Sequence, residues 1–187
     1  MRAALLPRTA VRLAARAAFA ATAAVALALG AAGAASAATS TRTVTDGGGT
    51  WRLALTVPAS AAAAGRNVTV TGSGFNPAKG VSVGLCAANG PQGSGKPTPC
   101  LGGSDQAGSI GASHWVNSTF GGTLPNTSAY GPGGTFRGTI HVKADLGNGR
   151  ICGDTVECAV VTRADHLDSA NRAYDVHVPV TFKNDRP

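Results

Sequence analysis

The chain has 187 residues, with 26 glycines and only 13% charged side chains, a composition that disfavours long helices and favours short strands joined by turns. Its net charge of +7 overstates the charge of the mature protein, because four of the arginines lie in an N-terminal segment that we expect to be removed. Twelve basic and nine acidic residues then remain. This small surplus does not indicate direct binding to nucleic acid, which typically needs a clustered basic face.

Residues 1–37 have the three-part organisation of a bacterial secretory signal peptide. A basic N-terminal region with four arginines is followed by an apolar run over residues 17–30. Ala35-Ser36-Ala37 then has the small-x-small pattern of a signal peptidase cleavage site. The apolar run is shorter than the roughly 20 residues of a membrane-spanning helix. We therefore expect cleavage before Ala38, a secreted extracellular protein, and no membrane association afterwards.

The next segment, residues 38–50, consists mainly of Ala, Thr, Ser and Gly. It is interpreted as a flexible leader. We expect one folded domain over residues 51–183, a length typical of a single domain.

Short runs of alternating or β-branched residues indicate an all-β domain. The clearest is 136–142, where Phe136, Ile140 and Val142 alternate with polar residues as in a half-buried strand. Seven such runs predict a β-sandwich; they lie at 51–57, 68–71, 81–86, 114–116, 136–142, 158–163 and 174–182. Pro179 lacks an N–H, so the last strand should lie at a sheet edge or contain a bulge.

Two Gly-, Pro- and Ser-rich segments separate these strands, at 87–112 and 119–134. We expect them to be long surface loops. Binding residues are often found on such loops.

Four cysteines lie in the expected mature chain, and an even number in an exported protein favours disulfides. Three pairings are possible, and we expect the local one, Cys86–Cys100 and Cys152–Cys158. A four-cysteine metal site is the alternative, but neither spacing resembles a zinc knuckle. We therefore expect no metal.

Several of these features together resemble the neocarzinostatin family, over residues 50–182. They are the 68–87 stretch VTVTGSGFNPAKGVSVGLCA, the Cys152-x5-Cys158 spacing, and the final V-x-V-x-V-x-F of residues 176–182. The resemblance implies a seven-stranded immunoglobulin-like β-sandwich with two local disulfides. Members of that family are secreted apoproteins that carry enediyne antibiotics. The resemblance therefore implies a secreted carrier, although an enediyne cargo does not follow from it, and we expect a monomer.

By this resemblance, the ligand is an apolar or aromatic small molecule held without a covalent bond. Antibacterial activity and DNA damage would belong to such a carried chromophore, so DNA would be a partner only through the cargo. The cleft of the family has the first disulfide on its floor. The matching residues here are Gly84, Cys86, Cys100, Ala159 and Arg163.

The sequence departs from the family two residues after the first cysteine. The better-known members have an aromatic residue at this position, whereas here it is Ala88, which offers no stacking surface. An aromatic wall would have to come from Trp115, Phe120 or Tyr130. We prefer Trp115 as a ligand-binding residue, and the alternative is that its side chain belongs to the core.

A catalytic role has little support in the sequence. There is no G-x-S-x-G motif for a nucleophile, and we expect no free cysteine. His166 lies near Asp165 and Asp168, as in a metal or base site, but Asp and His are also typical of turns, and we favour a turn. His141 and His177 alternate with the apolar residues of their strands, so we expect their side chains on the solvent-exposed face. We expect a protein that is not an enzyme.

A second, fainter likeness leads to an alternative function. Residues 161–166 and 175–182 resemble segments of secreted proteins of high-GC bacteria associated with haem uptake. The alternative is therefore an extracellular or cell-surface interaction module without antibiotic cargo, with haem as a less favoured ligand.

Overall fold

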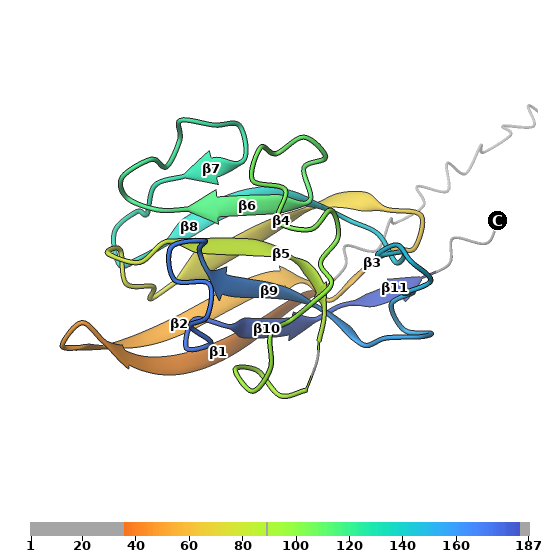
Figure 1. Ribbon diagram of the computed structural model, residues 1–187, viewed down its shortest axis with the longest axis horizontal. Coiled ribbons are helices and arrows are strands. Elements are labelled where there is room, and N and C mark those ends of the chain that lie inside the picture. Colours follow the sequence, from red (N-terminus) through yellow and green to blue (C-terminus); the bar gives the residue numbers. More distant parts are fainter. Residues whose placement is uncertain (1–35, 89, 184–187) are drawn as a thin grey trace, which may run out of the picture. The chain divides into compact units, whose positions relative to one another are not determined.

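A computed structural model describes residues 36–88 and 90–183, which form eleven strands and no helix (Figure 1). No helix in this described part is long and apolar enough to cross a membrane. The predicted signal peptide falls almost entirely outside the described residues, so cleavage before Ala38 stays a prediction.

Two larger sheets, antiparallel except for the pairing of β6 with β7, form the domain, and a small third sheet lies beside them. The first sheet has the order β1-β2-β4-β8; its strands are Ala37–Asp46, Gly49–Pro58, Arg66–Ser73 and Phe136–Val142. The second has the order β10-β9-β5-β6-β7; its strands are Val176–Pro179, Cys158–Ala164, Val81–Ala87, Ser113–Val116 and Thr127–Ser128, the last parallel to β6. The third pairs β3 (Ser60–Ala62) with β11 (Thr181–Lys183) in parallel.

The hydrophobic core lies between the two larger sheets. Leu53 and Ile140 of the first sheet and Leu85 and Val160 of the second belong to one cluster of buried residues. Strand β8 alternates buried and exposed side chains as its sequence predicts. The predicted all-β sandwich is confirmed. Six of the seven predicted runs each lie within one strand, and the last run is divided between two strands.

The interpretation of residues 38–50 as a flexible leader is wrong. Strand β1 pairs with β2 over its whole length, from Ala37 opposite Pro58 to Asp46 opposite Gly49. The run of alternating threonines favours a strand. The intervening Gly47 and Gly48 have φ of 59° and 76°, as a tight hairpin turn requires, so the glycines form a turn and not a loose tether.

The last predicted strand divides into β10 and β11. Strand β10 lies at the edge of its sheet and ends at Pro179, which confirms the edge position predicted from the missing N–H. The chain then continues to the third sheet. The extra strands β3, β7 and β11 have only two or three residues each, too few for a periodic pattern.

The predicted disulfide pairing is confirmed. Cys86 is bonded to Cys100 and Cys152 to Cys158. The first disulfide joins the end of β5 to Cys100, and the same two residues also form an isolated antiparallel β-bridge. The second disulfide closes a short turn before β9.

Candidate functional site

The outer face of the second sheet has three residues side by side on adjacent strands. Ser82 of β5 pairs with Trp115 of β6 on one side and with Arg163 of β9 on the other. Directly paired residues of neighbouring strands point to the same face. A small serine between two long side chains therefore leaves a hollow on this face.

Two loops complete the walls of this hollow, which has a volume of about 240 Å³. The loop before β6 contributes Lys96 and Gln106, and the loop after β9 contributes His166 and Arg172. We call this hollow, with Trp115 and Arg163 at its floor, the head pocket.

Trp115 lies outside both clusters of buried apolar residues. Its side chain is 9% exposed, and its indole Nε1 donates a hydrogen bond to Ser113 Oγ at 2.9 Å. The ring of His166 meets it edge-on, with centroids 6.0 Å apart. Trp115 therefore lines the head pocket and belongs to neither cluster of buried apolar residues.

Arg163 is half-buried in the head pocket. Among residues 36–88 and 90–183 its guanidinium makes no hydrogen bond and no ion pair. Burial lowers the pKa of Arg163, Asp175 opposes this effect and Arg172 adds to it. The group remains cationic, because an arginine is not deprotonated in proteins.

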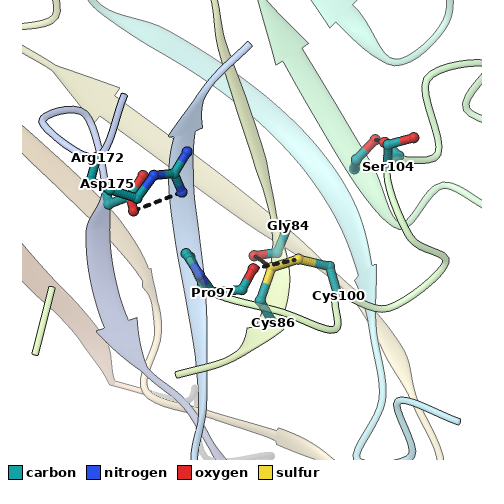
Figure 2. Close-up of a disulfide and its surroundings, with 8 residues drawn as sticks. Gly84, Cys86, Pro97, Cys100, Ser104, Arg172 and Asp175 are labelled. Atoms are coloured by element: carbon teal, nitrogen blue, oxygen red, sulfur yellow. Dashed lines mark hydrogen bonds and ion pairs between the residues drawn. A yellow bond between two sulfur atoms is a disulfide. The ribbon is translucent and has the colours of Figure 1, made fainter. Parts of the chain in front are cut away.

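Asp175 interacts electrostatically with this cation and is fully buried. Arg172 Nη1 donates to its Oδ2 at 3.1 Å (Figure 2), and Arg42 Nη1 donates to its backbone oxygen at 3.1 Å. Its Oδ1 has no partner among the described residues. Burial raises the pKa of Asp175 to about 6 despite the lowering effect of Arg172, Arg42 and Arg163.

This raised pKa predicts a pH-dependent stability. The folded state keeps the proton between about pH 4 and 6, where the unfolded chain, with a pKa of 3.8, has released it. The contribution of Asp175 is therefore present at low pH and is lost as pH rises through 6. Relative to wild type, Asp175→Asn should gain about 2 kcal/mol in free energy of unfolding between pH 4.5 and 7. Urea denaturation at the two pH values tests this, and a constant difference between the two proteins would contradict it.

The disulfide end of the same face is covered. Cys86, Cys100, Ala159 and Val161 form a separate buried cluster, with exposures of 0 to 8%. In Figure 2 the segment that carries Pro97 passes beside Cys86, and the carbonyl oxygen of Pro97 lies 3.6 Å from Cys100 Sγ.

Gln92 holds the same segment against the edges of the two sheets. Its Nε2 donates to the backbone oxygen of Thr41 in β1, and its Oε1 accepts from the backbone N–H of His177 in β10, both at 3.1 Å. The loop of residues 90–100 therefore lies against the disulfide end of this face.

The six predicted binding residues thus divide into two groups. Trp115 and Arg163 both line the head pocket. Of the others, Gly84, Cys86 and Ala159 are buried, and Cys100 is bonded to Cys86. Whether these four contact a ligand stays a prediction.

Sequence reasoning missed several lining residues. Ser82 could have been found from its parity with Gly84 in the β5 run. Lys96, Gln106 and Arg172 come from loops, and no local pattern indicates where a loop side chain points.

Other predicted polar and aromatic residues are also placed. Asp165 Oδ1 accepts a hydrogen bond from the backbone N–H of Leu167 at 2.9 Å, which confirms the turn interpretation around His166. His177 is only 9% exposed, so its predicted exposure to solvent is wrong. The 90–100 loop covers the edge of the sheet at β10, where Gln92 accepts a hydrogen bond from the His177 backbone N–H. Tyr130 packs near Phe75 at 6.4 Å between ring centroids and faces the core.

The fold and the site define a β-sandwich with a cation and an indole in one hollow of its outer face. No family model and no curated protein matches the chain. Among solved structures, macromomycin is similar, with a TM-score of 0.43, 19% identity, and coverage of 70% of this chain and 99% of that chain. Membership of the neocarzinostatin family therefore stays a prediction.

Proposed function

We propose that this protein is a secreted, non-enzymatic binding protein for an aromatic small molecule with an acidic group. The observation that carries the proposal is the half-buried Arg163 cation, which has no bonded partner among the described residues and lies across Ser82 from the Trp115 indole. A cation withdrawn from water without a partner costs free energy. An acidic ligand would offset that cost.

The remaining features of the head pocket favour the same ligand. The part of the Trp115 indole that lines the pocket offers apolar surface to an aromatic ring. Lys96 adds positive charge near Arg163, and Arg172, which is paired with Asp175, also lines the head pocket. Asp165 is the one acidic side chain among the described residues of that lining. The sequence resemblance to the neocarzinostatin family also supports a carrier of an aromatic chromophore.

Titration with 1-naphthoate, followed by tryptophan fluorescence, tests this proposal. We expect saturable quenching, which Trp115→Phe removes and Trp51→Phe keeps, because Trp51 lies in strand β2 and its indole bonds to the backbone of Asp46. Arg163→Gln should weaken binding about tenfold, since a hydrogen bond to a charged group contributes roughly 1.5–3 kcal/mol. Absence of saturable quenching, or binding unchanged by Arg163→Gln, would overturn the proposal.

A further inference from the structure

A second hollow adjoins the head pocket on the other side of Trp115. Its volume is about 260 Å³ and its lining includes Phe120, Leu124 and Thr123. Trp115, His166 and Gln106 line both hollows. We call the second hollow the tail pocket. The shared residues make the two hollows parts of one groove, with the indole at their junction.

The tail pocket exposes large apolar side chains. Phe120 is 65% exposed and Leu124 is 50% exposed, although both belong to residue types that usually avoid water. Isolated exposed apolar residues are common, but two that line the same hollow next to an indole mark a binding surface.

The loop that carries Phe120 and Leu124 is held by its own hydrogen bonds. The Phe120 backbone N–H donates to Asn117 Oδ1. Thr127 Oγ1 accepts from the backbone N–H groups of Gly122 and Leu124 at 2.9 and 3.1 Å. The apolar side chains are therefore presented by an organised loop, which reduces the entropy lost when a ligand binds.

The two hollows differ in charge. The head pocket contains Lys96, Arg163 and Arg172, whereas the described lining of the tail pocket has no Asp, Glu, Lys or Arg. Each hollow alone is smaller than the roughly 300 Å³ at which pockets for drug-sized ligands begin. A ligand of that size must extend over both, with its acidic group at one end and an uncharged apolar group at the other.

We propose that the ligand is a two-part aryl acid, whose acidic ring system occupies the head pocket and whose second apolar group occupies the tail pocket. Phe120 and Leu124 then determine specificity for the second group. This inference rests on the proposed function for the head pocket. It adds a binding surface in the segment between β6 and β8.

Two probes separate the inference from the proposed function. Naphthalene-1-sulfonate has only the acidic ring system, and 8-anilinonaphthalene-1-sulfonate adds a phenyl group. In wild type we expect the anilino probe to bind about tenfold more tightly, because its phenyl ring leaves water. The double variant Phe120→Ser/Leu124→Ser should lose that advantage and bind naphthalene-1-sulfonate within about twofold of wild type.

Leu167→Ser is the matched control, because Leu167 is 82% exposed and lines neither hollow. It should leave both dissociation constants unchanged. The inference about the tail pocket would be overturned, with the proposed function intact, if both probes bound wild type with equal affinity. The same holds if the double variant still bound the anilino probe more tightly than naphthalene-1-sulfonate. Absence of naphthalene-1-sulfonate binding would overturn the proposed function and this inference with it. All affected residues are exposed, and unchanged thermal unfolding would confirm that the variants fold.

Discussion

Gly74→Ala is expected to lower the free energy of unfolding by about 4 kcal/mol. Gly74 has a φ of +74°, and a Cβ atom there would lie 1.9 Å from the backbone oxygen of Arg52. The overlap is with backbone and not with a movable side chain. The backbone N–H of Gly74 also donates to the oxygen of Gly133 at 2.9 Å, which prevents an easy shift. A loss of this size is a large part of the stability of a typical domain.

Gly48→Ala is the control for this prediction. Gly48 has almost the same φ, +76°, but a Cβ there meets nothing within 4 Å. Gly48→Ala should therefore lower the free energy of unfolding by only about 1 kcal/mol, the cost of placing a residue with a Cβ in the left-handed backbone conformation. Urea denaturation of the two variants measures the difference. Similar losses for both would contradict the steric explanation and assign the effect to backbone conformation alone.

The second large effect concerns the first disulfide. The double variant Cys86→Ala/Cys100→Ala should lose about 3 kcal/mol, because the bond joins residues separated by 14 positions. The matched variant Cys152→Ala/Cys158→Ala should lose about 2.5 kcal/mol, since its separation is only 6. Denaturation of both variants under the same non-reducing conditions gives the comparison.

The two disulfide variants should differ more clearly in ligand binding. Without the first disulfide, the 90–100 loop keeps only noncovalent contacts, among them the hydrogen bonds of Gln92 and the bond from the Ala87 backbone N–H to the Pro99 oxygen. Lys96 of the head pocket lies on that loop. Affinity for 1-naphthoate should fall severalfold in that variant and stay unchanged in the other. If both variants kept wild-type affinity, the loop would not shape the head pocket.

Local periodicity explains why much of the fold was predictable. Strands β5, β8 and β9 each have seven residues, enough for a period-two pattern to identify the core face. The two disulfides were predictable because each joins cysteines close in sequence, so no long-range information was needed.

Strand β1 was missed for a different reason. One of its inward-facing positions is Arg42. A charged residue at such a position does not fit the usual pattern of apolar residues on the core side of a strand. Arg42 becomes acceptable only because it donates to the backbone of Asp175, 133 residues away in the sequence. Long-range partners of this kind leave no trace in a local window.

The sequence by itself determined the all-β class and the disulfide pairing, because these follow from residue spacing along the chain. Arg163 was selected from the resemblance to the neocarzinostatin family, and Trp115 was preferred because Ala88 offers no aromatic surface. The tertiary structure alone decided that the two side chains flank Ser82, that Asp175 is buried and interacts with the cation, and that the 90–100 loop covers the disulfide. The physical reason is that strand register and loop position depend on contacts between distant segments. A pocket formed by five such segments has no local sequence pattern.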